Sequence, residues 1–592
     1  MSLLRLVVVA LLAIAAMPHT LFAEDNPTAK QLHQLFADDW QWRLDNYPTL
    51  GTSIGDPRGN DKWTDLSPEA IAEREKHPHA LLEQLKQIDA SQLTGQDLLS
   101  YELFDYNVRR QIEGQKYPTE LLAIDQLGGP QFDLAYTAEQ MPFQTVKDYE
   151  NYIARLNSFP KYLEQNTDLL REGIAKRWVQ PPGPLRSIPK QISGQVLADA
   201  TDSPLFKPFK DFPDSISQAQ QDRLAKLGKA AIADRVFPAM LKLKTFIEDE
   251  YLPNGAEIIG AAALPGGRDY YAYKCRYSTT TDLTPQEIHE IGMSEVKRIR
   301  GEMEKVIRES GFEGSFEEFI HFLKTDPQFY YTQADDLLIG YRDIAKRVDA
   351  ELPKLFVELP RLPYGVKAFP DYEAPNQTSA RYYRGSAEAA RAGFFMANTY
   401  ALDSRPKYEM EALTLHEACP GHHLQIARAQ ELTDLPRFRR QGHYTAFVEG
   451  WALYAESLGD EMGFYQTPYD KFGQLTFEMW RACRLVVDTG MHNMGWSRAQ
   501  AIEFFKDNSG KSDLEVAVEI DRYIVWPGQA LAYKIGELQI KQLRAKAEQE
   551  LGEDFDLRQF HNAVLDNGAV PLPILQRLID RWIAEQKTKQ TS

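Results

Sequence analysis

One interrupted, histidine-rich segment constrains the fold of this 592-residue chain more than any other part. It reads Leu413-Thr-Leu-His416-Glu417-Ala-Cys419-Pro420-Gly421-His422-His423-Leu424-Gln425. The pattern predicts a helix that begins near Tyr408 and carries His416 and Glu417 near its middle. Pro420 lacks a backbone N–H, and its ring collides with the carbonyl four residues back, which is that of His416. The helix must therefore bulge or break at Pro420-Gly421, where glycine tolerates unusual torsions.

The histidine spacing departs from the helical zinc-binding pattern His-Glu-x-x-His. In that pattern the two imidazoles lie four residues apart on one helix face, and the intervening glutamate activates water. Here Pro420 occupies the fourth position, and on an ideal helix His422 would lie about 9 Å farther along the axis. A bulge at Cys419-Pro420-Gly421 could return His422 to the place of the second ligand, while His423 contacts substrate or supports a ligand. The sequence favours His422 over His423 and leaves the choice open.

Two carboxylates on a later predicted helix complete the candidate metal site. Glu449 and Glu456 lie one heptad apart in the segment Phe447–Glu456, so they share a helix face. We assign Glu449 to the metal and Glu456 to the support of an imidazole N–H. Two histidines and one glutamate suit a single catalytic Zn²⁺ that keeps one position open for water. The alternative is a network of paired His and Glu side chains inside a helical core.

Segments throughout the chain resemble a bacterial family called domain of unknown function 885. The likeness covers nearly the whole mature chain and includes Leu264–Gly267, Thr284–His289, Leu413–Gln425, Glu449–Glu456, Arg484–Gly490 and Trp526–Lys534. More distantly, Thr445–Glu449 and Gly421-His422-x-Leu424 are similar to segments of the thimet oligopeptidase-like zinc peptidases. The resemblance implies a mainly α, gluzincin-like helical metallopeptidase fold with a small β-sheet flanking a deep cleft. It also implies zinc on His416, His422 and Glu449, with Glu417 as the general base.

Further residues are candidates for contacts with a reacting peptide. The oxyanion formed during hydrolysis needs a donor besides the metal. The candidates for this donor are Tyr533, Tyr523, His492 and His443. Similar enzymes use a tyrosine from a late helix, which favours Tyr533, although a place in the aromatic core would explain it equally well. Arg522 and Lys534 could bind a terminal carboxylate of the substrate and so favour carboxypeptidase or dipeptidase action; structural salt bridges are the alternative for both.

The N-terminus and the overall charge predict an exported protein that does not bind nucleic acid. The formal net charge is −18 with a pI near 5.3, and no basic footprint for phosphates is found. Residues 1–23 read as a secretory signal, in which Arg5 precedes an apolar run shorter than the about 20 residues that span a membrane. We therefore expect a periplasmic or secreted protein without stable membrane insertion after signal removal, an uncleaved anchor being the alternative. No cysteine lies near the cleavage region, which disfavours a lipoprotein anchor.

The mature chain reads as mostly helical, without a repeat or a low-complexity linker. We expect an N-terminal helical half, residues 24–250, and a C-terminal half, residues 251–592, that form one continuous catalytic unit. Tyr270–Thr280 is rich in aromatic and β-branched residues and predicts a short strand or hairpin. Gly393–Thr399 predicts a strand that either holds an extended peptide along its free edge or is a buried connector. Helical periodicity marks Gln31–Asp45, Pro68–Ile88, Thr145–Ile174, Gln218–Glu250 and Thr284–Ser310.

These features together predict an exported zinc metallopeptidase that cleaves small or unfolded peptides. Glu417 would accept a proton from the attacking water and pass it to the leaving amine. One alternative is a zinc amidase or esterase that acts on non-peptide substrates, and another is a periplasmic metal-binding helical protein without turnover. Glu417 argues for hydrolysis, because a binding protein would not need a base beside the ligands. Substrate length, end preference and oligomeric state stay open.

Overall fold

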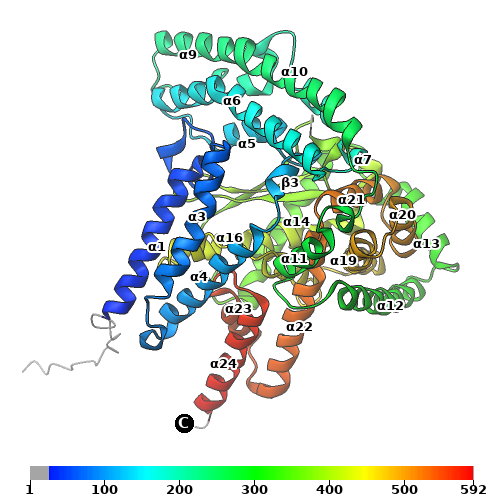
Figure 1. Ribbon diagram of the computed structural model, residues 1–592. Helices are drawn as coiled ribbons and strands as arrows, with labels where there is room; N and C mark the ends of the chain where they lie inside the picture. Colours follow the sequence, from blue (N-terminus) through cyan, green and yellow to red (C-terminus); the bar gives the residue numbers. More distant parts are fainter. Residues whose placement is uncertain (1–25, 372, 591–592) are drawn as a thin grey trace, which may run out of the picture.

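Helices dominate the structure, a computed structural model that describes residues 26–371 and 373–590. Within these residues, 24 α-helices and one three-stranded sheet are present (Figure 1). The predicted mainly α class with a small sheet is confirmed. The predicted signal segment, residues 1–23, lies outside the described residues. No helix in the described ranges combines the length and the apolar character needed to cross a membrane.

The N-terminal helices form two groups in Figure 1, α1, α3 and α4 in one and α6, α9 and α10 in the other. Their bounds are α1 (Pro27–Asn46), α2 (Pro48–Ile54), α3 (Pro68–Leu85), α4 (Gly95–Gly114), α5 (Pro130–Gln140), α6 (Val146–Lys176), α7 (Pro182–Leu185), α8 (Ile188–Ser193), α9 (Gln218–Ala231) and α10 (Phe237–Phe246). The expected long helices are confirmed here. A π-helical turn, Ile232–Val236, joins α9 to α10, so the expected helix from Gln218 is continuous.

The remaining helices lie in two stretches of the chain, one before and one after the sheet. Before the sheet lie α11 (Gly267–Thr279), α12 (Pro285–Glu309), α13 (Phe316–Thr325) and α14 (Ala334–Leu355). After it lie α15 (Met410–Glu417), α16 (His422–Glu431), α17 (Arg437–Arg440), α18 (Thr445–Ser457), α19 (Pro468–Asn493), α20 (Arg498–Asn508), α21 (Asp513–Val525), α22 (Ala532–Leu551), α23 (Leu557–Leu565) and α24 (Leu572–Gln590).

Two glycines let α18 and α22 cross closely. A Cβ on Gly536 would lie 1.9 Å from the carbonyl oxygen of Ala446, and one on Gly450 would lie 2.5 Å from Gly536 Cα. Any side chain would therefore push the helices apart. This crossing matters for function, because α18 carries Glu449 and Glu456 and α22 carries Tyr533.

The sheet contains β1 (Tyr364–Ala368), β2 (Ala380–Tyr383) and β3 (Gly393–Ala397) in the order β1-β3-β2. β1 runs parallel to β3, and β2 runs antiparallel to it. The predicted strand at Gly393–Thr399 is confirmed as β3. Of the two roles left open for it, the buried connector agrees with the structure, and the free edge that holds a peptide is wrong. Both edges of β3 are paired, because the chain returns on each side of it, and the edge strand nearest the candidate metal site is β2.

The prediction of a strand or hairpin at Tyr270–Thr280 is also wrong, since these residues form α11. Tyr271, Cys275 and Ser278 follow helical spacing and are all buried. Burial of one helix face therefore outweighs the β propensity of the aromatic residues. The surrounding hydrophobic core is continuous from Leu99 to Ile583, so helices from both predicted halves contribute to it.

Candidate metal centre

Three helices bring His416, His422 and Glu449 together. His416 lies at the end of α15, His422 at the start of α16 and Glu449 on α18. One candidate ligand atom of each residue lies within 4.8 Å of the others. Glu449 Oε2 is 3.2 Å from His422 Nε2 and 3.8 Å from His416 Nε2. Within the residues that the structure describes, no other group of His, Cys, Asp and Glu side chains is arranged in this way.

The helix breaks at Pro420-Gly421, as expected, but it ends earlier than predicted. α15 stops at Glu417, so His416 and Glu417 occupy its last turn rather than its middle. The connection Ala418–Gly421 contains a cis peptide bond before Pro420. A Cβ on Gly421 would lie 2.0 Å from the carbonyl oxygen of His416, so only glycine fits there. Trp451 on α18 donates its indole N–H to the Pro420 carbonyl at 2.8 Å, which ties the connection to the helix that bears Glu449.

Glu456 contacts the Nδ1 atom of the His416 imidazole, while Nε2 of the same ring faces Glu449. The Oε1 atom of Glu456 is 2.7 Å from His416 Nδ1, and Arg481 Nη2 lies 3.3 Å from the same oxygen. The Nδ1–H therefore donates to Glu456, which leaves the His416 Nε2 lone pair directed at Glu449 and His422. Burial disfavours the charged imidazole, yet the nearby carboxylates of Glu449 and Glu456 raise the pKa of His416 above its usual value.

His423 points away from this cluster. Its ring nitrogens contact the Tyr382 hydroxyl at 2.9 Å and the Leu362 carbonyl at 2.9 Å. Burial lowers the pKa of His423 to about 4, so the ring is neutral at physiological pH. The structure thus places His422, and not His423, beside His416 and Glu449, and gives His423 contacts with β2 and the segment before β1.

A cavity of about 370 Å³ opens beside the three side chains. Glu417 lines it together with His416, His422 and Glu449. Glu417 is only 7% exposed, and no hydrogen bond or ion pair within the described part of the chain engages its carboxylate. An unpaired carboxylate beside the candidate ligands is free to accept a proton from a water molecule in the cavity.

Three of the predicted substrate-contact residues line this cavity, namely Tyr533, Arg522 and His443. The Tyr533 ring stacks near the His416 ring, with centroids 6.2 Å apart. Its hydroxyl accepts a hydrogen bond from Arg522 Nη2 at 2.9 Å. Tyr533 therefore reaches the site, with its hydroxyl held by a guanidinium group.

Three other predicted contacts are wrong. Lys534 is fully buried in an ion-pair network with Glu478, Glu537 and Glu295, because it points to a different side of α22 from Tyr533. His492 has both ring nitrogens bonded to backbone groups of Ala261 and Tyr523, and Tyr523 bonds Glu519, Trp480 and Arg484. Lys534, His492 and Tyr523 do not line the cavity and are structural residues.

The sequence interpretation overlooked several cavity residues, above all Arg381 on β2 and Arg481, Arg484 and Trp480 on α19. A usable signal was present for the two arginines of α19. They lie three residues apart on one face of a helix whose neighbouring residues are almost all apolar, and charged residues are rarely buried unless they are paired or functional.

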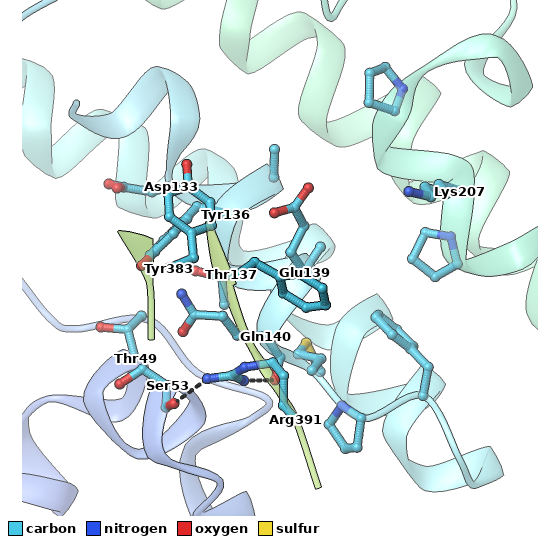
Figure 2. Close-up of a pocket in the computed structure, with 18 of the residues that line it drawn as sticks. Thr49, Ser53, Asp133, Tyr136, Thr137, Glu139, Gln140, Lys207, Tyr383 and Arg391 are labelled. Carbon is cyan, nitrogen blue, oxygen red and sulfur yellow. Dashed lines mark hydrogen bonds between the residues drawn. The ribbon is translucent and has the colours of Figure 1, made fainter. Parts of the chain in front are cut away.

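Two larger cavities adjoin this one and together form the expected deep cleft. A middle cavity of about 480 Å³ shares Arg381, Tyr382 and Trp526 with the metal-site cavity. A third, of about 1500 Å³, shares Tyr136 and Tyr383 with the middle one and is shown in Figure 2. In that view Arg391 crosses from the β3 side to the carbonyl groups of Ser53 and Gln140 in the N-terminal helices. The cleft therefore runs between the N-terminal helices, the sheet and the metal site.

The three candidate ligands fit zinc. Two ligand atoms, each about 2.1 Å from a tetrahedral zinc, lie about 3.4 Å apart. The two separations that involve Glu449, 3.2 and 3.8 Å, bracket this value, and all three ligand atoms lie within 4.8 Å of one another. Glu449 Oε2 is also buried without a hydrogen-bonding partner among the described residues, as expected for an atom that binds a metal. His422 and His416 lower the pKa of Glu449 well below its usual value despite the opposing effect of burial, so this carboxylate is ionised.

Comparison with solved structures finds structural relatives that cover most of this chain. One, described as a "putative lipoprotein" from Colwellia psychrerythraea, is 28% identical, with a TM-score of 0.88 over 94% of this chain and 99% of that one. Another, described as a "putative lipoprotein of unknown function" from Shewanella oneidensis, is 18% identical, with a TM-score of 0.67 over 93% of this chain and 99% of that one, and so supports the fold alone. A "putative oligoendopeptidase F" from Bacillus anthracis is 10% identical over 86% of this chain and 92% of that one, and its TM-score of 0.32 is too low to bear on this chain.

No curated protein matches the chain. A family model described as "bacterial protein of unknown function (DUF885)" matches residues 48–579. That range includes the metal centre, the sheet and all the segments on which the resemblance rests. The expected family is therefore confirmed, and this chain belongs to the DUF885 family of bacterial proteins.

Proposed function

We propose that this protein is a zinc-dependent peptidase that hydrolyses peptide bonds in small or unfolded peptides. The observation that carries the proposal is the convergence of His416, His422 and Glu449, with the unpaired carboxylate of Glu417 in the same cavity. A zinc ion bound by these residues would act as a Lewis acid for the substrate carbonyl and would lower the pKa of water. A metal-binding protein without turnover would gain nothing from Glu417.

Two residues of the chain have roles in the chemistry. Glu417 accepts the proton of the attacking water and returns it to the nitrogen of the leaving amine. The hydroxyl of Tyr533, polarised by Arg522, donates a hydrogen bond to the oxyanion that develops on the substrate carbonyl.

The edge strand β2 supports a peptide as the substrate. Asn398 N–H donates to the Ser379 carbonyl at 3.0 Å, so Ser379, Arg381 and Tyr383 direct their main-chain groups toward β3. By the antiparallel alternation, Ala380 and Tyr382 direct theirs toward the free edge. Both residues line the metal-site cavity. An extended peptide can therefore add to β2 and pass the candidate metal centre.

Metal analysis combined with a peptide-library digest tests the proposal. We expect about one zinc per chain, and hydrolysis that a chelator abolishes and zinc restores. Glu417→Gln should retain zinc and lose about 10²- to 10⁴-fold in kcat, because the base is removed and the ligands are kept.

Glu411→Gln is the matched control, since Glu411 lies on the same helix but pairs with Arg347 outside the cavity. Metal-free protein, or digestion unchanged by Glu417→Gln, contradicts the proposal. Hydrolysis of esters or non-peptide amides alone would instead favour the amidase or esterase alternative.

We also propose that the chain is exported, as the signal pattern of residues 1–23 predicts. The description of the Colwellia psychrerythraea relative as a putative lipoprotein agrees with export. Fractionation of cells that express the full chain should place the protein outside the cytoplasm with an N-terminus near Glu24. Retention of Met1–Ala23 on a cytoplasmic protein contradicts this proposal.

A further inference from the structure

Arginine side chains are concentrated in the cavity beside the metal centre. Four guanidinium groups line it, those of Arg381, Arg481, Arg484 and Arg522. Besides Glu449, the carboxylates of Glu417 and Glu519 line the cavity; Glu519 is 3.0 Å from Arg484 and 3.5 Å from Arg522, and Glu456 is 3.3 Å from Arg481. Arg381 has no hydrogen bond or ion pair within the described ranges. Among the described residues, Arg484 and Arg522 thus share one carboxylate, that of Glu519, and a second guanidinium charge on one carboxylate is costly in a buried site unless an anion joins them.

The arginines of α19 and α21 lie one aromatic ring away from the metal centre. Arg484 Cζ lies 4.2 Å from the centre of the Tyr533 ring, and the His416 ring is 6.2 Å from the same ring. Arg522 bonds the hydroxyl of the same tyrosine. Arg484 Nη1 and Arg522 Nε are buried and have no hydrogen-bonding partner among the described residues. We name Arg484, Arg522 and Tyr533 the arginine corner.

The distance from the metal centre to the arginine corner suits a short leaving group. One residue of an extended chain spans about 3.5 Å. A peptide whose scissile carbonyl lies beside His416 therefore reaches past Tyr533 with one or two further residues. A carboxylate at the end of that short segment would meet guanidinium groups, which bind carboxylates with strong, charge-assisted hydrogen bonds.

The direction of β2 fits the same arrangement. The residues just before β2, Thr378 and Ser379, line a small cavity with Trp480 and Glu519, so this end of the strand adjoins the arginine corner. The other end, Tyr383, faces the middle cavity and the large one. A peptide that pairs antiparallel to β2 would direct its C-terminus toward the arginines. The opposite direction would place an N-terminal ammonium group among like charges.

The large cavity has room for the part of the substrate on the N-terminal side of the scissile bond. It lies beyond Tyr383 and is bounded by α5 and β3, where Figure 2 shows Tyr136, Glu139 and Arg391 around it. Its volume of about 1500 Å³ far exceeds that of the cavity at the metal centre, about 370 Å³. The space for substrate is therefore unequal, being wide on the N-terminal side of the scissile bond and narrow on the C-terminal side.

We propose, on the basis of the peptidase function above, that the arginine corner binds a substrate carboxylate on the leaving-group side, and that this is the C-terminal carboxylate of an oligopeptide. The protein then removes one or two residues from the C-terminus of its substrates. An acidic side chain in the leaving group is the other source of the same chemistry.

Three versions of one peptide distinguish these sources: a free C-terminal acid, the matching C-terminal amide, and an amide with glutamate as its last residue. Binding to the zinc-loaded Glu417→Gln protein is measured by calorimetry, so the result does not depend on turnover. We expect the free acid to bind about 10- to 100-fold more tightly than both amides, since a charged hydrogen bond is lost. With the active protein, we expect cleavage of the free acid one or two residues from its end.

Arg522→Gln should reduce the ratio of acid to amide affinity toward one. The matched control is Arg498→Gln, because Arg498 pairs with Asp521 outside the cavity. Zinc content and melting temperature verify that each variant folds. If Arg522→Gln does not fold, the ratio of acid to amide affinity in the protein without this substitution still tests the proposal.

Equal binding of the acid and the amide, or cleavage at internal positions of both, overturns the carboxylate proposal and leaves the peptidase function intact. Tight binding of the glutamate amide overturns the C-terminal source and assigns the corner to an acidic side chain. Preferential binding of the free acid without cleavage of any peptide supports carboxylate binding by the arginine corner. The same result contradicts the peptidase function.

Discussion

Glu456 offers the sharpest test of the metal centre, because it touches a candidate ligand without being one. Its side chain is fully buried, and its Oε1 is shared by His416 Nδ1 and Arg481 Nη2. Glu456→Gln keeps the size of the side chain and one acceptor oxygen but removes the negative charge. The imidazole of His416 then becomes a weaker donor to a metal, and Arg481 is left as an uncompensated cation close to the site.

The magnitude follows from these contacts. Loss of such a partner typically weakens metal binding 10- to 100-fold, or about 1.4–2.7 kcal/mol. Because one acceptor oxygen is kept while the charge that balances Arg481 is lost, we expect about a 30-fold increase in the Kd for zinc. Competition between the protein and a chromogenic chelator at fixed pH measures this Kd directly.

The control for this measurement is Glu537→Gln. Glu537 is as buried as Glu456 and pairs with Lys534 at 2.7 Å, but it has no contact with the three candidate ligands. We expect it to lower the melting temperature without changing the Kd for zinc. An unchanged zinc Kd in Glu456→Gln refutes the role assigned to Glu456, and an equal loss in both variants shows that general destabilisation, not support of His416, causes the effect.

Three other substitutions test the surroundings of the centre. Gly421→Ala should prevent the α15–α16 connection from forming, with a loss of more than about 4 kcal/mol in unfolding free energy and of zinc binding, because its Cβ would overlap the His416 carbonyl; retention of both by this variant contradicts the reasoning. Trp451→Phe removes the bond to the Pro420 carbonyl and should cost about 1–3 kcal/mol in denaturant unfolding and weaken zinc binding, whereas Trp480→Phe, which loses an indole bond to Tyr523, should leave zinc binding unchanged. Burial raises the pKa of Asp488 to about 7, above its unfolded value of 3.8, so the unfolded chain releases this proton first and stability falls as pH rises between these values. Asp488→Asn should therefore reduce the change in unfolding free energy over this pH range by at most about 4 kcal/mol. Identical profiles of unfolding free energy against pH for both proteins would contradict the raised pKa of Asp488.

The helical class, the long N-terminal helices and the break at Pro420 were predictable because each depends on local chemistry. Apolar periodicity marks a helix face, and proline excludes a regular helix wherever it stands in the interior. Tyr270–Thr280 shows where local chemistry is insufficient. Its aromatic residues favour a strand in isolation, but Tyr271 and Cys275 are buried on one side of a helix by partners far away in the sequence.

Assignments of single residues to the substrate cavity depended on tertiary structure in the same way. Tyr533 and Lys534 are adjacent in sequence, and both were candidates for substrate contact. Adjacent residues of a helix point in directions about 100° apart, so Tyr533 lies in the cavity and Lys534 in a cluster of three carboxylates. Sequence periodicity indicates that the two face different directions, but it does not say which direction contains the metal centre.

The break between α15 and α16 links these observations into one physical account. In a continuous helix both imidazoles would be fixed by the backbone of that helix alone. Here His416 ends one helix and His422 begins the next, so their separation depends on the Ala418–Gly421 connection. Two contacts from α18 hold that arrangement, the bond of Trp451 to Pro420 and the bond of Glu456 to His416, and the same helix carries Glu449. The three candidate ligands are therefore positioned through α18, and the close crossing of α18 with α22 places Tyr533 relative to them.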